Sequence, residues 1–205
     1  MKKILTIISL CFLMFILGRI TESDATPIDT IEEITTSYSI EGEYVESDID
    51  YESDALYIKK TFKPNMSTSK IKHLLIYIDG LCKHYNLNYN LVKSVISTES
   101  AWKYNAKSSA GAKGLMQIMK ACAIDYKTPH SEMYDPYVNV TIGIKYLSKL
   151  NNRFDDTQTA LVAYNEGPRH AGRYRREYID NSNYVHKVMT HFITFNPIEG
   201  LAYND

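Results

Sequence analysis

The sequence predicts an all-α domain, because apolar residues recur at helical spacing in three separate stretches. Positions three, four and seven apart share one face of a helix, and residues 71–85, 92–99 and 138–150 carry such stripes. The chain has 205 residues, of which 44% are hydrophobic and 23% are charged. That length and composition suit one globular domain with additional segments.

Residues that favour helix ends mark the limits of the predicted helices. Ser67 or Thr68 can cap the first helix, and Asn88 or Asn90 can cap the second. A further short helix over 157–164 ends where a Gly-Pro pair follows. We interpret the first and third of the striped helices as core elements without a chemical role.

Residues 1–20 have the pattern of a signal peptide or a membrane anchor. Two lysines follow Met1 and precede an apolar run over 4–17, which is short for a membrane span. Small residues at Ser23 and Ala25 offer a cleavage point, but they lie downstream of the apolar run, so an uncleaved anchor stays open as the alternative. The sequence predicts an exported protein in both cases.

Charge is strongly segregated along the chain. Residues 21–57 hold twelve acidic residues and no Lys or Arg, whereas residues 58–205 hold 20 basic and 12 acidic ones. We interpret 21–60 as an acidic, disordered linker, because like charges repel and keep it extended. An inhibitory or substrate-mimicking arm is the alternative. The remaining domain, 61–200, is basic, which suits an anionic polymer.

Cysteine and histidine usage predicts no metal site and no cofactor. Once a signal peptide is removed, two cysteines remain, Cys82 and Cys122. They are either a disulfide or two buried small side chains, and sequence leaves both open. There is no Cys-x-x-Cys motif, and the closest histidine pair, His186 and His191, is five residues apart, so the two fall on different faces of a helix.

One helix face changes from apolar to acidic at its last position. Val92, Val95, Ile96 and Glu99 share this face. Desolvation of a carboxyl raises its pKa by disfavouring the charged form, and a proton retained near neutral pH is what a general acid needs. Glu99 is therefore the candidate catalytic residue. A solvated glutamate at the end of a helix is the alternative.

Three short motifs recur in a fixed order around this glutamate. They are Glu99-Ser100, Gly114-Leu115-Met116-Gln117 and Ala163-Tyr164-Asn165-Glu166-Gly167-Pro168. Together they resemble the soluble lytic transglycosylase family, whose members cleave peptidoglycan. The resemblance covers roughly residues 70–195. It implies a goose-type lysozyme-like helical fold for the catalytic domain.

The resemblance also implies roles for other residues. Ser108 would lie beside the cleaved sugar, Gln117 would bond acetamido groups of the substrate, and Met116 would line the groove. Tyr164 would present a ring and a hydroxyl to a sugar, and Tyr184 would lie near the glutamate. The implied substrate-binding residues are Ser100, Ser108, Met116, Gln117, Tyr164, Asn165 and Tyr184. The alternative for Gln117 is a surface amide on a helix, and the alternative for Ser108 is a loop hydroxyl that bonds its own backbone.

The chain departs from the family pattern in two places. Glu166 stands where a small residue is usual and adds a second carboxylate to the cleft. Asp180-Asn181-Ser182-Asn183 replaces the charged residues that often precede the Tyr-Val pair. A basic run over 169–176 is either a solvated face or a contact for peptide carboxylates.

The count of carboxylates favours a mechanism without water. Ordinary glycoside hydrolysis usually needs two carboxylates, and only Glu99 lies at a position that the family uses for chemistry. The resemblance implies that the muramyl C6 hydroxyl attacks C1 and forms a 1,6-anhydro sugar. The alternatives are a lysozyme in which Glu166 or Asp125 activates water, and a binding module without catalysis. A nucleic-acid partner matches no motif.

The resemblance implies peptidoglycan glycan strands as the partner and the periplasm or cell envelope of a bacterium as the location. A cell-envelope assembly or secretion machine is a second expected partner. Membrane contact is expected only through the N-terminal segment if that segment is not cleaved.

Overall fold

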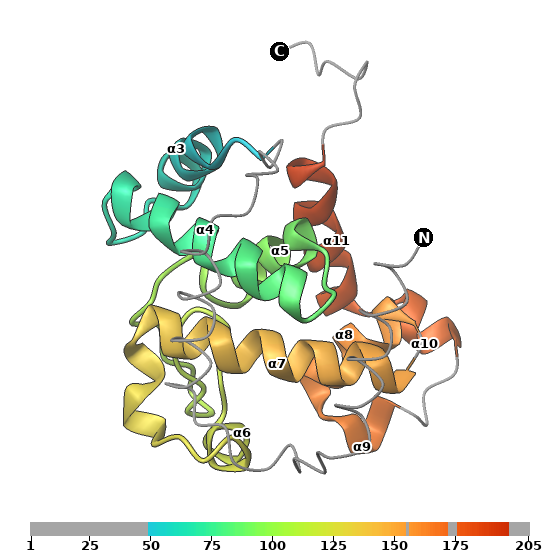
Figure 1. The fold of residues 1–205 in the computed structure, drawn as a ribbon. Coiled ribbons are helices and arrows are strands. Elements are labelled where there is room, and N and C mark those ends of the chain that lie inside the picture. The colour runs from blue at the N-terminus through green and yellow to red at the C-terminus, as the bar shows by residue number, and fades with distance from the viewer. Residues whose placement is uncertain (1–48, 155, 172–175, 197–205) are drawn as a thin grey trace, which may run out of the picture. The chain divides into compact units, whose positions relative to one another are not determined.

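The computed structural model describes residues 49–154, 156–171 and 176–196, all of which lie in one compact unit, Gly42–Asp205 (Figure 1). Every named element in these ranges is a helix, and only isolated β-bridges occur beside them. This confirms the all-α prediction for the part of the chain that is described. The predicted signal segment and residues 21–48 of the predicted linker lie outside it.

The helices follow one another along the chain with few long connections. Their bounds are α3 Tyr51–Phe62, α4 Thr68–His84, α5 Tyr89–Ser100, α6 Lys120–Asp125, the 3-10 helix η1 His130–Tyr134, α7 Pro136–Phe154, α8 Thr157–Glu166, α9 Pro168–Ala171, α10 Arg176–Asp180 and α11 Asn183–Phe195.

Helix α3 corrects the predicted linker, whose last ten residues were expected to be disordered. The Asp50 side chain caps α3 by accepting hydrogen bonds from the backbone N–H groups of Glu52 and Ser53. Acidic residues in the first turn favour a helix because they face its positive end. Ala55 and Ile58 are fully buried and anchor the helix, and α3 packs on α4. The acidic residues at 51–60 favoured the prediction of a linker, although this stretch forms most of a helix of the domain.

Two of the predicted helix caps are present. The Ser67 hydroxyl accepts from the N–H of Lys70 at the start of α4, and the Asn88 side-chain Oδ1 accepts from the N–H of Leu91 at the start of α5. At the far end of α8, Gly167 has a φ of 91°, a conformation that favours glycine. Glu99 therefore lies in the last turn of α5, and the Tyr164-Asn165 pair lies in the last turn of α8.

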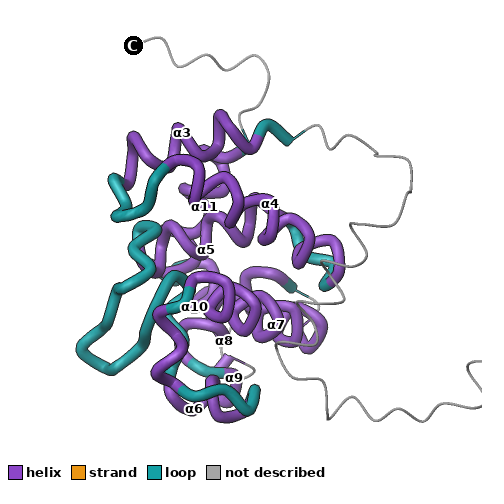
Figure 2. The backbone as a smooth tube through the Cα atoms, turned by 60° about the vertical axis from the view of Figure 1, so that its left-hand side comes forward, coloured by secondary structure: helices purple, strands orange, loops and turns teal. Residues whose placement is uncertain are grey.

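Helix α7 forms the centre of the domain. In Figure 1 it runs across the view, with α4 and α5 on one side and α6 and α9 on the other. It packs against both α4 and α8, and Val140, Ile142 and Ile144 on it are fully buried. None of the described helices is long and apolar enough to cross a membrane. Figure 2 shows the long loop that joins α5 to α6 and carries the second motif.

Candidate active site

Glu99 lies in the last turn of α5 and is half-buried. Burial raises the pKa of its carboxyl to about 7, and a hydrogen bond from Tyr184 opposes this rise. The direction agrees with the prediction from the helix face. A carboxyl with this pKa holds its proton on about half of the molecules at neutral pH, so it is able both to give and to take a proton.

Trp102 anchors the end of α5, a role that sequence reasoning missed. Ala101 and Trp102 both take left-handed backbone conformations, with φ of 49° and 62°. The indole is fully buried and donates from Nε1 to the Ser97 hydroxyl at 2.9 Å. A tryptophan directly after a helix end could have drawn attention to this anchor. It fixes the turn that Glu99 occupies.

Tyr184 is the direct partner of the glutamate. It lies in the first turn of α11, where the Ser182 hydroxyl caps the helix. Its hydroxyl donates to Glu99 Oε1 at 2.7 Å. Burial raises the pKa of this phenol well above its ordinary value, and the nearby Glu99 adds to the rise. Tyr184 therefore remains a neutral hydrogen-bond donor at every physiological pH.

Tyr164 connects α8 to the loop that precedes α6. Its hydroxyl donates to the Met116 carbonyl oxygen at 2.8 Å, and its ring lies 5.4 Å from that of Tyr146 between centroids. Burial raises its pKa well above the ordinary value, and Glu99 contributes to the rise. The third motif is thereby joined to the second, close to the glutamate.

The Gly114–Gln117 motif forms a turn, and the next helix, α6, begins at Lys120. Gln117 has a left-handed φ of 49°, and its Nε2 donates to the Gly114 carbonyl oxygen at 2.9 Å. The turn is held from behind by Asn139 of α7, whose Oδ1 accepts from the Met116 N–H at 2.7 Å. Asn139 had no motif to signal it.

Met116 does not line the groove with its side chain. The side chain is fully buried and packs against Gly143 of α7, where an added Cβ would come within 2.3 Å of the Met116 sulfur. Leu115 is also fully buried, so the turn is anchored by two apolar side chains. Met116 contributes to the site through its carbonyl oxygen, which accepts from Tyr164.

The hydroxyls of the two predicted serines bond to nearby backbone. Ser100 donates to the Ile96 carbonyl oxygen at 3.2 Å and is only 8% exposed. The Ser108 hydroxyl accepts from the Ala112 N–H at 3.0 Å. For Ser108 this is the arrangement that the residue-based alternative expected. Both serines shape the backbone around the site.

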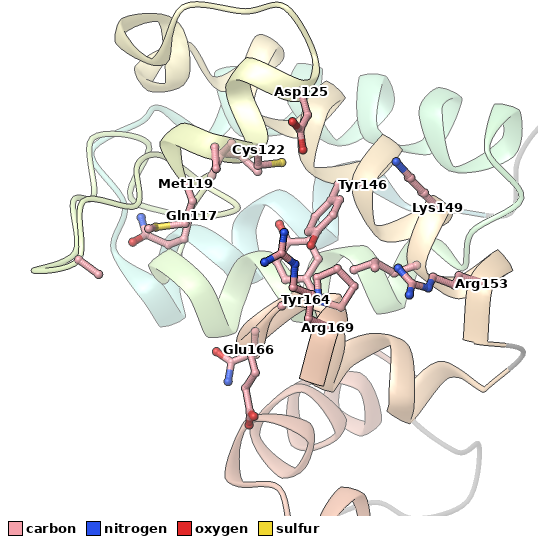
Figure 3. Close-up of a pocket in the computed structure, with 17 residues that line it drawn as sticks. Gln117, Met119, Cys122, Asp125, Tyr146, Lys149, Arg153, Tyr164, Glu166 and Arg169 are labelled. Carbon is pink, nitrogen blue, oxygen red and sulfur yellow. The ribbon is translucent and has the colours of Figure 1, made fainter. Parts of the chain in front are cut away.

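A groove of about 720 Å³ lies beside these residues (Figure 3). Tyr146 and Tyr164 lie in its middle, with Gln117 and Glu166 to one side of them in this view. Its charged and polar lining residues are Gln117, Cys122, Asp125, Tyr146, Lys149, Arg153, Tyr164, Asn165, Glu166 and Arg169. The combination of aromatic rings, amides and cations suits a sugar polymer that carries acidic groups.

A smaller hollow of about 350 Å³ adjoins the groove at the end of α8. Asn165 and Glu166 line both hollows, and Tyr184 lines the smaller one. Glu99 lines neither, and Tyr184 links it to the smaller hollow. Glu166 accepts a hydrogen bond from the Tyr178 hydroxyl at 2.9 Å, which ties the end of α8 to α10.

The two cysteines remaining after the signal segment are both free. Cys82 is buried and Cys122 lines the groove. Burial raises the pKa of each thiol to about 12, which leaves them as poorly reactive thiols. Within the described ranges, no cluster of His, Cys, Asp or Glu could hold a metal ion.

Comparison with known proteins gives a consistent result. The model of the family described as "Transglycosylase SLT domain" matches residues 76–186, more than half of the chain. Among curated proteins, the transglycosylase of Enterobacteria phage PRD1 is 39% identical over 94 residues, which are 46% of this chain and 35% of the phage protein.

Two bacterial relatives match the same part of the chain. Membrane-bound lytic murein transglycosylase E of Buchnera aphidicola subsp. Baizongia pistaciae is 32% identical over 47% of this chain and 50% of its own. The soluble lytic murein transglycosylase of Escherichia coli K12 is 35% identical over 49% of this chain and 17% of its own. The chain thus spans half or less of the length of these relatives.

Solved structures share the fold. An inactive mutant of lytic transglycosylase Slt from Pseudomonas aeruginosa aligns with a TM-score of 0.52 and 18% identity, over 84% of this chain and 30% of that one. The 70 kDa soluble lytic transglycosylase SLT70 of Escherichia coli aligns with a TM-score of 0.51 and 20% identity, over 85% and 32%. The expected lysozyme-like helical fold is confirmed.

Proposed function

The chain belongs to the transglycosylase SLT domain family, and we propose that it cleaves the bond between N-acetylmuramic acid and N-acetylglucosamine in peptidoglycan with formation of a 1,6-anhydro sugar. The observation that carries this proposal is the half-buried Glu99, whose carboxyl has a pKa of about 7 and one hydroxyl donor, Tyr184. The murein transglycosylases among its relatives support the same substrate.

Glu99 acts first as the acid. Its proton passes to the glycosidic oxygen as the bond from that oxygen to the muramyl C1 breaks, and the acetamido group of the same sugar stabilises the cationic C1. The Tyr184 hydroxyl then donates to the newly formed carboxylate, which a charge-assisted hydrogen bond stabilises. The neutral phenol supplies this stabilisation without adding a competing charge.

Glu99 acts next as the base. Its carboxylate removes the proton from the muramyl C6 hydroxyl as O6 forms a bond to C1, so the acid is regenerated and no water is consumed. One carboxyl group is sufficient for both steps. The alternative hydrolysis needs a second carboxylate, and the partner that faces Glu99 is a phenol.

The groove would hold the glycan strand on either side of this centre. Tyr146 and Tyr164 offer apolar ring surfaces, and Gln117 and Asn165 offer amides for acetamido and hydroxyl groups. Ser100 and Ser108 support the backbone around them. We further propose that the protein works in the bacterial cell envelope, which accords with the apolar N-terminal run and the names of the relatives.

Mass spectrometry of the products tests the proposal. The full chain is incubated with purified peptidoglycan in water enriched in heavy oxygen, with Glu99→Gln as the paired variant. Products lighter by one water than reducing sugars, and free of label, support the transglycosylase. Labelled reducing products would establish a lysozyme, and binding without any product would establish a peptidoglycan-binding module.

A further inference from the structure

We propose that Lys93 is a positioning residue, which holds α5 in register with α11 through a buried ionic junction with α3 and so keeps Glu99 against the Tyr184 hydroxyl. This inference rests on the proposed role of Glu99. The junction consists of Asp54, Tyr89, Lys93 and Phe195.

Lys93 is a buried cation in contact with a carboxylate and two aromatic rings. Its side chain is 2% exposed, and Nζ lies 2.6 Å from Asp54 Oδ2. The same nitrogen lies 4.5 Å from the Tyr89 ring centroid and 4.4 Å from that of Phe195. A buried ammonium is tolerated only when it is paired and hydrogen-bonded. Directional contacts on several sides therefore fix its position, and with it the position of α5.

The junction joins three helices. Asp54 belongs to α3 and also accepts from the Tyr89 hydroxyl at 3.1 Å, while Phe195 ends α11. Helix α3 contacts α11 directly as well, since the rings of Tyr57 and Phe195 lie 5.7 Å apart. A second ring pair, Phe62 and His191, lies 5.6 Å apart. Helix α3 therefore braces the C-terminal half of α11 against α5.

Polar ties occur at the two ends of the α5–α11 pair. At the end beside the junction, Asn90 Nδ2 donates to Asn196 Oδ1 at 2.7 Å, and at the other end Tyr184 donates to Glu99. The two helices also contact one another along their length, and each has buried apolar side chains, such as Val95 on α5 and Val188 on α11. Apolar contacts are non-directional, so they allow small shifts between helices. The polar junction is what sets the register.

The junction also draws on segments outside the region that matches the family model. That match covers residues 76–186, whereas Asp54 precedes it and Phe195 follows it. Only Tyr89 and Lys93 lie inside. Segments from both sides of the matched region thus converge on one lysine of the helix that carries Glu99.

Direct measurement of the Glu99 pKa tests the proposal without requiring enzymatic turnover. Carbon-13 NMR follows the glutamate carboxyls of the labelled full-length protein during a pH titration, and Glu99→Gln assigns the signal. The variants are Lys93→Met and the double variant Lys93→Met/Asp54→Asn, which leaves no unpaired buried charge. Glu52→Gln is the matched control, because it breaks only the exposed α3–α4 ion pair with Lys72.

A shift of α11 admits water to Glu99, and burial is the larger of the two influences on its pKa. We therefore expect the Glu99 pKa to fall by about one unit in both Lys93 variants, a tenfold change in the protonation equilibrium. Turnover of peptidoglycan should fall about tenfold with KM changed less than twofold, as for an interaction that acts on the chemical step. Lys93→Arg should restore part of the Glu99 pKa and part of the turnover, and the Glu52→Gln control should match the wild type in both quantities.

Two outcomes would overturn the inference. A folded double variant with the wild-type Glu99 pKa would show that the junction only stabilises the fold. An equal fall of the Glu99 pKa and of turnover in Glu52→Gln would show that the loss of any contact of α3 has the same effect. If the wild-type protein releases no anhydro product, the proposed function fails, and the NMR titration still decides whether Lys93 positions the glutamate.

Discussion

Two ionisable residues of α5, the buried Lys93 and the half-buried Glu99, lie six positions apart and differ in the group that each one meets. Lys93 meets a carboxylate and two rings; burial lowers the pKa of its ammonium, and the hydrogen bond and negative charge of Asp54 oppose that fall. Glu99 meets a neutral phenol, so burial is not compensated by an opposite charge and its proton is retained to about pH 7. A paired charge holds helices together, and a carboxyl whose partner is a neutral hydroxyl is available for proton transfer.

Glu99→Gln should have the largest effect, because glutamine accepts the Tyr184 hydrogen bond but has no proton to give. We expect release of anhydro products to fall by at least about a thousandfold, within the range for a lost general acid. Muropeptide release per mole of enzyme measures this. Cleavage at more than a tenth of the wild-type rate would remove Glu99 from the chemistry.

Asp54→Asn tests the pairing of Lys93, because it leaves the buried Lys93 ammonium without a counter-charge. The free energy of unfolding should fall by about 3 kcal/mol, as when one partner of a buried ion pair is removed. Urea titration followed by circular dichroism measures it. Lys93→Met/Asp54→Asn should recover much of the loss, and a single variant as stable as the wild type would mean that water already solvates Lys93.

The raised pKa of Glu99 predicts a dependence of stability on pH. Below its ordinary value of 4.5 the carboxyl is protonated in both folded and unfolded chains. Between pH 4.5 and about 7 the unfolded chain ionises first, so this group lowers the stability of the fold progressively. The free-energy difference between Glu99→Gln and the wild type should therefore rise by about 3 kcal/mol across this window. Denaturation at pH 4.5 and pH 8 measures it, and a constant difference would contradict the shift.

Tyr184→Phe sharpens the comparison by removing the hydroxyl that donates to Glu99. That hydrogen bond favours the charged form, so its loss should raise the Glu99 pKa above 7. Turnover should fall about tenfold, as for one lost hydrogen bond to a charged group. The decline of turnover at high pH should move to more alkaline pH, because the Glu99 carboxyl keeps its proton up to a higher pH. A pH profile of turnover distinguishes this result from simple misfolding, which lowers turnover without changing the pH at which turnover declines.

Lys149→Gln/Arg153→Gln should have the smallest effect. These cations are exposed in the groove, unlike Lys93, so salt and water screen them. We expect a rise in KM of about threefold for glycan strands that carry stem peptides, with kcat unchanged. Strands stripped of peptides should show no change, and Lys60→Gln provides the control, because Lys60 is an exposed cation of α3. An equal rise for both substrates would assign the cations to the glycan itself.

Local patterns predicted what local physics controls. The stripe that ends in Glu99 predicted a buried carboxyl, and Ser67 and Asn88 marked true helix starts, because spacing and capping act within one or two turns. The order of the motifs along the chain, compared with the family pattern, also predicted that Tyr184 lies near Glu99. The same reasoning missed α3, since its acidic first turn resembles a solvated linker.

Other features depend on partners far away in the sequence, and only the tertiary structure decided them. Met116 is buried because Gly143 leaves room for it, and Gln117 lies in a turn because Asn139 holds the loop from behind. Asp54 and Lys93 are 39 residues apart, and Tyr184 and Glu99 are 85 apart. The sequence by itself determined which helix carries a buried acid. Packing between distant helices decided which group faces that acid and which cation fixes the helix, because burial and pairing are properties of neighbours in space.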